Sequence, residues 1–128
     1  MIKVLLISVD KTIKLFVENN YNNSDYQFII LSSITDPLEI ISQICSINPS
    51  VLILDDDLIS PNSQRLLKSI KKVNPKLAII FLTSNTSLEL GRAINAIGVI
   101  FYLMKPISEN EFQEFLKSTK MQLSQNIY

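Results

Sequence analysis

Residues Val51 to Asp57 read Val-Leu-Ile-Leu-Asp-Asp-Asp, a short apolar run that leads directly into three carboxylates. The run includes β-branched residues and has no polar alternation, which is typical of a strand buried on both faces. Like charges a few ångströms apart repel one another by roughly 1–4 kcal/mol, depending on the local dielectric. Three aspartates at the end of such a strand therefore indicate a nearby positive group, either a metal ion or a lysine. Taken alone, the triplet is equally compatible with a solubilising loop.

Four further apolar runs of strand length occur along the chain, and segments with helical periodicity separate them. The runs are Ile2–Ile7, Phe28–Leu31, Leu77–Leu82 and Val99–Met104. Residues that typically begin a helix precede or start each helical segment: Thr12, Asp36 with Pro37, Ser60 or Asn62, Ser87, and Ser108 with Glu111. Residues that typically end a helix are Asn48, Asn74 and Gly98. Buried strands joined by helical crossovers predict an α/β domain in which helices cover both faces of a parallel sheet. The length suits one domain over residues 1–128.

The composition argues against several classes of function. Twelve basic residues balance twelve acidic ones, and we find no basic run or basic amphipathic helix, so neither nucleic acid nor a membrane is an expected partner. The absence of histidine excludes histidine-based triads and the common zinc sites. Cys45 lies on the predicted helical face of Leu38, Ile41 and Ile44 and is expected in the core. A single cysteine and no signal peptide fit a cytoplasmic location.

Polar side chains follow four of the predicted strands. In parallel sheets of this kind, ligands bind outside the carboxyl ends of the strands. Those ends carry Ser8, Val9, Asp10, Asp55, Asp56, Asp57, Thr83, Ser84 and Lys105. Each residue alone has an ordinary structural interpretation, but together they suit phosphoryl chemistry. A carboxylate can act as nucleophile, further carboxylates can hold Mg²⁺, and a hydroxyl and a lysine can bind phosphoryl oxygens.

Three stretches resemble the receiver domain of bacterial two-component response regulators, and the likeness extends over essentially the whole chain. They are Pro49–Asp55, Ile79–Ser84 and Ala96–Pro106. The resemblance implies a flavodoxin-like, doubly wound (βα)5 fold with a five-stranded parallel sheet in the order 2-1-3-4-5. It also implies that Asp55 is the phosphoacceptor and that Thr83 and Lys105 bind the phosphoryl oxygens. Thr83 and Tyr102 would be the switch residues, and the Lys105–Pro106 peptide bond a candidate for the cis form.

The sequence departs from the receiver pattern at the expected Mg²⁺ site. Receivers usually place two adjacent acidic residues after the first strand, whereas Ser8 and Val9 stand there and only Asp10 is acidic. We hypothesise that Asp57, with or without Asp10, replaces the missing pair and holds Mg²⁺ together with Asp55. By strand alternation, Asp56 is expected to point elsewhere and to take no part.

Three functions remain open from the sequence. The first is a receiver that accepts a phosphoryl group on Asp55 from a histidine kinase or phosphotransfer protein and signals to a downstream effector or output domain. Its signalling face would be the fourth helix, the fifth strand and the fifth helix, and could also support a homodimer. The second is a degenerate receiver that binds proteins without phosphorylation.

The third is a phosphatase of the haloacid-dehalogenase type, because Asp55, Asp57, Thr83 and Lys105 resemble its catalytic set. That family carries its Asp-x-Asp motif near the start of the chain and needs another acidic motif after the lysine. Here the motif follows the third strand, so we do not expect an enzyme.

Overall fold

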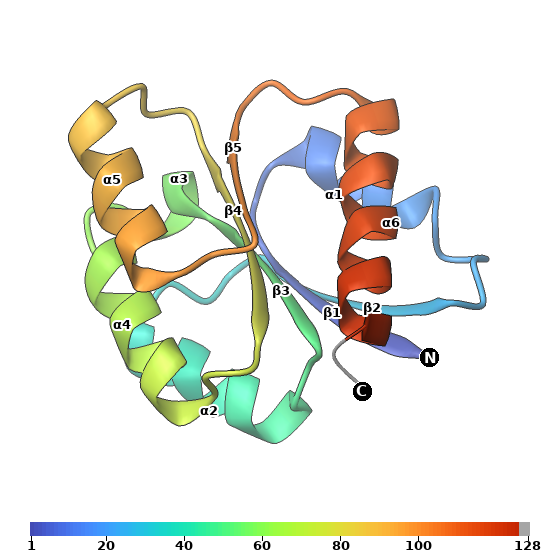
Figure 1. The fold of residues 1–128 in the computed structure, drawn as a ribbon, viewed down its shortest axis with the longest axis horizontal. Helices are drawn as coiled ribbons and strands as arrows, with labels where there is room; N and C mark the ends of the chain where they lie inside the picture. The colour runs from blue at the N-terminus through green and yellow to red at the C-terminus, as the bar shows by residue number, and fades with distance from the viewer. Residues whose placement is uncertain (126–128) are drawn as a thin grey trace.

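In the computed structural model, which describes residues 1–125, the chain forms a parallel sheet in the order β2-β1-β3-β4-β5 (Figure 1). The strands are β1 (Ile2–Ile7), β2 (Tyr26–Leu31), β3 (Val51–Asp55), β4 (Ala78–Thr83) and β5 (Phe101–Met104). The helices are α1 (Lys11–Glu18), α2 (Pro37–Ile47), α3 (Asp56–Ile59), α4 (Ser63–Val73), α5 (Leu88–Ile97) and α6 (Glu109–Gln125). The expected flavodoxin-like fold and strand order are confirmed.

Helices cover both faces of the sheet, with α1 and α6 on one side and α2 to α5 on the other (Figure 1). Successive side chains of a strand point to opposite faces, so β3 supplies both cores. Val51 and Ile53 join the core under α1 and α6, and Leu52 and Leu54 join the other. All four are at most 1% exposed. Burial of each such side chain contributes about 1.5–3 kcal/mol, which explains an apolar run without alternation.

Most of the predicted helix signals lie at helix ends, but the first helix begins at Lys11 with Asp10 as its N-cap, one residue before the expected start at Thr12. Asp36 is the N-cap of α2, and its carboxylate accepts a hydrogen bond of 3.1 Å from the Leu38 amide. Ser108 and Glu111 form the expected capping box at the start of α6, with hydrogen bonds of 3.1 and 3.4 Å. Gly98 ends α5 with a φ of 107°, a conformation that strains residues with a Cβ atom.

The expected buried face of α2 is wrong by part of a turn. Ile40 and Ile44 are buried, whereas Leu38 is 76% exposed and Cys45 is also exposed. Residues four positions apart share a helix face, but Cys45 follows Ile44 by one position and is therefore rotated by about 100° from it. Cys45 is thus a surface residue and not part of the core.

Helices α3 and α4 also differ from expectation. Helix α3 follows β3 without a loop, because the Asp55 carboxylate caps it by accepting a hydrogen bond of 3.0 Å from the Asp57 amide. The interpretation that the chain has no basic amphipathic helix is wrong. Helix α4 buries Leu66, Leu67 and Ile70 and carries Arg65, Lys68, Lys71 and Lys72. The balanced overall charge conceals this local excess.

Candidate functional site

Asp55 lies at the carboxyl end of β3 and is only 1% exposed. Its Oδ2 atom accepts a hydrogen bond of 2.6 Å from the Ser8 hydroxyl, which follows β1, and one of 2.6 Å from the Lys105 ammonium, which follows β5. Its Oδ1 atom accepts from the Asp57 amide. The sheet thus brings residues from three separate strand ends onto one carboxylate.

Lys105 is the common partner of three carboxylates. Its Nζ atom lies 2.6 Å from Asp55 Oδ2, 2.9 Å from Asp57 Oδ2 and 3.1 Å from Asp10 Oδ2. Burial alone would lower the pKa of Lys105, but the hydrogen bonds to Asp55, Asp57 and Asp10 outweigh it and raise that pKa. The ammonium is therefore held charged and partly neutralises the aspartates, as the crowding of carboxylates after β3 requires.

Asp10 and Asp57 are anchored by further donors. Asp10 is the N-cap of α1 and accepts hydrogen bonds from the amides of Thr12 (2.9 Å) and Ile13 (3.2 Å). Asp57 accepts from the hydroxyl of Ser84 (2.6 Å) and from its amide (3.2 Å). Burial raises the pKa of each carboxyl, but these hydrogen bonds and Lys105 more than compensate, so both pKa values are lowered.

Asp56 takes part in the site, contrary to the expectation from strand alternation. It forms no ion pair with Lys105 within residues 1–125, but it is 3% exposed and accepts hydrogen bonds from Thr83 Oγ1 (2.7 Å) and Ser63 Oγ (2.5 Å). The reason is that α3 begins at Asp56, so the chain turns toward β4 and α4 instead of continuing as a strand. Thr83 therefore binds Asp56 here, and no hydrogen bond joins it to Asp55 among the described residues.

Tyr102 of β5 lies against the neighbouring strand. Its ring stacks on that of Phe81, with centroids 5.4 Å apart and planes at 17°. Among residues 1–125, its hydroxyl is the buried side-chain polar atom without a hydrogen-bond partner. Burial, followed by the charge of Asp56, raises the pKa of this phenol. The ring also closely flanks α5, since a Cβ atom at Gly91 would lie 3.7 Å from it.

The residues that replace the usual acidic pair differ from one another. Ser8 is 2% exposed and binds Asp55, whereas Val9 is 55% exposed. The roles of Ser8, Ser63 and Ser84 as hydrogen-bond donors to the aspartates were not predicted. Ser8 and Ser84 could have been found from their place at strand ends, but Ser63 lies at the start of α4 and has no such signal. The Lys105–Pro106 bond is cis, as expected.

Asp10, Asp55 and Asp57 surround the Lys105 ammonium, which occupies the position between them that a metal ion would need. Within residues 1–125, no group of three acidic, histidine or cysteine side chains has the spacing to hold a metal ion. Asp10 and Asp57 nevertheless keep exposed fractions of 26% and 37%, and carboxylate oxygens are suitable ligands for Mg²⁺. The donor set therefore fits a divalent cation only if Lys105 releases these two carboxylates.

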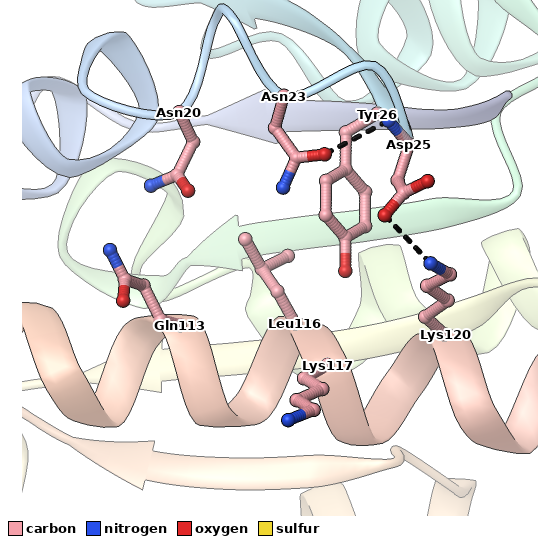
Figure 2. Close-up of a pocket in the computed structure, with 8 residues that line it drawn as sticks. All are labelled: Asn20, Asn23, Asp25, Tyr26, Gln113, Leu116, Lys117 and Lys120. Atoms are coloured by element: carbon pink, nitrogen blue, oxygen red, sulfur yellow. Dashed lines mark hydrogen bonds and ion pairs between the residues drawn. The ribbon is translucent and has the colours of Figure 1, made fainter.

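Two hollows of similar size lie near the ends of the sheet. One, of about 300 Å³, opens beside the cluster and is lined by Asp10, Thr12, Ser84 and Lys105, together with Ile13, Pro106 and Ile107. The other, of about 320 Å³, lies between α6 and the loop before β2 (Figure 2). There, the Lys120 ammonium lies 2.7 Å from Asp25 and ties α6 to that loop, and Tyr26 packs beside Leu116 (Figure 2). Of these two hollows, the first lies beside the cluster around Asp55, because Asp10, Ser84 and Lys105 line it.

The sequence matches the family described as "Response regulator receiver domain" over residues 4–117. The chain belongs to this family. Among solved structures, this receiver is similar to a CheY-like receiver domain protein from Methanospirillum hungatei, with a TM-score of 0.80 and 21% identity, covering 98% of each chain. It is also similar to chemotaxis protein CheY4 of Vibrio cholerae, with a TM-score of 0.74 and 21% identity, covering 93% of this chain and 98% of that one.

A response regulator from Thermotoga maritima has a TM-score of 0.76 at 16% identity, covering 93% of this chain and 97% of that one. At such identities the likeness of the structures shows the fold alone. No curated protein sequence matches this receiver. Receiver domains are generally signalling modules that interact with histidine kinases and output domains and bind Mg²⁺ at an acidic pocket. No helix within residues 1–125 has the length and apolar character needed to cross a membrane.

Proposed function

We propose that this receiver accepts a phosphoryl group on Asp55 from the phosphohistidine of a partner kinase or phosphotransfer protein. The observation that supports this most is the pairing of the Asp55 carboxylate with Lys105 at 2.6 Å, beside a hollow that reaches the surface. In this proposal, Lys105 is the charge-assisted donor that would bind the phosphoryl oxygens. Because the chain has no histidine, the donor must be another molecule.

In the proposed reaction, a carboxylate oxygen of Asp55 forms a bond to phosphorus while the bond from phosphorus to the donor nitrogen breaks. The electron pair of that bond leaves with the donor imidazole, and Asp55 becomes an acyl phosphate. The acyl phosphate carries about 1.5 to 2 negative charges where the Asp55 carboxylate carried one, beside Asp10 and Asp57. Lys105 then changes from a partner of three carboxylates to a partner of the phosphoryl oxygens.

A bound Mg²⁺ would supply the remaining positive charge, and Asp57, Asp55 and Asp10 are the residues we propose would hold it. We expect Asp57→Asn to weaken Mg²⁺ binding in a calorimetric titration, because it removes a charged oxygen ligand. The matched control is Asp36→Asn, which alters a helix cap away from the site. Equal Mg²⁺ affinity of Asp57→Asn and the wild type would contradict the proposed role of Asp57.

The proposed switch depends on Thr83, which binds Asp56 before phosphorylation. To reach a phosphoryl group on Asp55, the Thr83 hydroxyl has to break its hydrogen bond to Asp56. A hydrogen bond to a carboxylate contributes about 1.5–3 kcal/mol. Tyr102, whose hydroxyl is buried without a partner, is the proposed second switch residue. The short helix α3 was not among the expected helices, so the expected fourth and fifth helices are α5 and α6 in the structure. We propose that the signalling and possible homodimer face is formed by α5, β5 and α6, where Leu88 and Met104 are exposed.

Incubation with acetyl phosphate and Mg²⁺, followed by intact mass spectrometry, tests the proposal. We expect the wild type to gain the mass of one phosphoryl group and Asp55→Asn to gain none. Lys105→Met, which keeps an unbranched side chain without the charge, should be labelled less. No gain in the wild type would contradict phosphorylation.

The second candidate is a receiver that binds partners without phosphorylation. It is favoured by the occupancy of both Asp55 oxygens, by the 1% exposure of Asp55, and by Ser8 and Val9 at the place of the acidic pair. An unlabelled wild type would support it. We do not propose phosphatase activity, because Asp57 is bound by Ser84 and Lys105 and is not free to act as an acid.

A further inference from the structure

Helix α4 and the turn after it carry an uncompensated positive charge. Five of the twelve basic residues lie between Arg65 and Lys76, and no acidic residue occurs from Leu58 to Leu88. The five are Arg65, Lys68, Lys71, Lys72 and Lys76. The remaining seven basic residues share the rest of the chain with all twelve acidic ones. The net charge of zero therefore conceals a strongly basic surface.

These basic side chains find no carboxylate within the described part of the chain. The ion pairs formed by residues 1–125 use the ammonium groups of Lys105 and Lys120. Lys71 donates to the carbonyl of Pro75 at 3.4 Å, and Lys68 and Lys72 are exposed. Adjacent like charges on one helix face are mildly destabilising, so an anionic partner would relieve their repulsion.

A groove of about 450 Å³ runs between α4 and α5, two helices that lie on the same side of the sheet (Figure 1). Along α4 it is lined by Gln64, Lys68, Lys71 and Lys72, and along α5 by Ala93, Ala96 and Ile97. The spacing of three and four residues makes each set one stripe of its helix. The groove thus has an apolar side of small residues and a cationic rim.

We propose that this groove binds an acidic amphipathic helix of a partner protein. Alanines at positions 93 and 96 leave room for the apolar face of a third helix to approach α5 closely. Acidic residues at the edge of that helix would meet Lys68 and Lys72, which are one turn apart. The site lies on the opposite side of the sheet from α6 and is distinct from the cluster around Asp55.

The lining of the groove favours a helix over other polyanions. A membrane surface binds long protruding apolar side chains flanked by lysines, whereas the apolar side of this shallow groove consists of Ala93 and Ala96, which are short, and Ile97, which is half-buried. Nucleic acid binding relies on phosphate contacts and on base or groove contacts, and the apolar side chains of α5 offer no hydrogen bond to either. Only an amphipathic partner contacts both the apolar side of the groove and its cationic rim.

An NMR titration of the ¹⁵N-labelled full chain tests the proposal. The probe is a synthetic helical peptide with leucine on one face and glutamate along its edges, and the matched control peptide carries glutamine in place of glutamate. We expect shift changes confined to α4 and α5, and weaker binding at higher salt. Changes located elsewhere, or equal binding of the glutamine peptide, would overturn the proposal.

Variants separate the contribution of the cationic rim to peptide binding from that of the apolar side of the groove. We expect Lys68→Gln with Lys72→Gln to weaken peptide binding about tenfold, since two rim ion pairs are lost. The matched control is Lys14→Gln with Lys117→Gln, which removes two exposed charges from the opposite face of the molecule. It should change the peptide affinity by less than about twofold. Ala96→Trp keeps every charge but fills the groove, and should abolish binding.

Other polyanions are tested against the same protein. The helix proposal would be contradicted if phosphatidylglycerol vesicles, duplex DNA or a second copy of the chain bound more tightly than the acidic peptide and if this binding depended on Lys68 and Lys72.

Discussion

Asp56 is the residue whose role differs most from expectation. Its carboxyl group is buried next to Asp55 and Asp57, and the hydroxyl groups of Thr83 and Ser63 donate hydrogen bonds to it. These donors lie 27 and 7 residues away in the chain, so no local pattern predicts the pairing. By contrast, the convergence of Asp55 and Lys105 could be predicted, because carboxyl ends of parallel strands share one edge of the sheet.

We expect Thr83→Val to lower the free energy of unfolding by about 1.5–3 kcal/mol, since it leaves the buried Asp56 carboxylate with one donor fewer. Valine matches threonine in shape, so the change creates no cavity. Ser84→Ala is the matched control, because it removes a hydroxyl bond to the exposed carboxylate of Asp57 and should cost less than about 1 kcal/mol. Urea denaturation measures both. A loss no larger for Thr83→Val than for Ser84→Ala would argue against the buried pair.

Tyr102 should make the receiver less stable at alkaline pH. Because its pKa is raised in the folded state, the folded protein holds the phenolic proton more tightly than the unfolded chain does. Stability from this group is complete below the unfolded pKa of about 10 and declines as the pH rises above it. We expect Tyr102→Phe to lose less stability than the wild type between about pH 9 and pH 11. Tyr26, whose pKa burial also raises, is present in both proteins and cancels. Equal losses in urea titrations would contradict this.

Helix α2 shows why helix existence was predictable and its buried face was not. The cap at Asp36 and the proline after it mark the start locally. With isoleucines at positions 40, 41, 44 and 47, the apolar residues extend around much of the helix, so several faces fit the sequence. The sheet selects the face of Ile40 and Ile44.

We therefore expect Ile40→Ala to destabilise the protein by about 2–5 kcal/mol, because it opens a cavity in a fully buried position. Leu38→Ala in the same helix should change stability by less than about 0.5 kcal/mol, since Leu38 is 76% exposed. Thermal or urea unfolding of the two variants gives the comparison. Similar costs would mean that α2 packs on a different face.

Two regions of the molecule carry concentrated charge of opposite sign. Asp10, Asp55 and Asp57 gather around Lys105 at the carboxyl edge of the sheet, and four basic residues without a carboxylate among them lie on α4. The sequence allowed the fold, the strand order and the edge to be predicted, because they follow from strand burial and from family motifs. The basic surface of α4 could not be recognised as a run, because Arg65, Lys68, Lys71 and Lys72 alternate with apolar residues in the sequence and meet only on the helix surface.

Asp55 is the residue that we propose accepts the phosphoryl group. Borohydride reduces an aspartyl phosphate to homoserine, which marks the modified residue permanently. After incubation with acetyl phosphate and Mg²⁺, reduction and proteolysis, we predict that peptide mass spectrometry finds homoserine at position 55 in the wild type and none in Asp55→Asn. Homoserine at position 56 or 57, or at no position in the wild type, would contradict the claim.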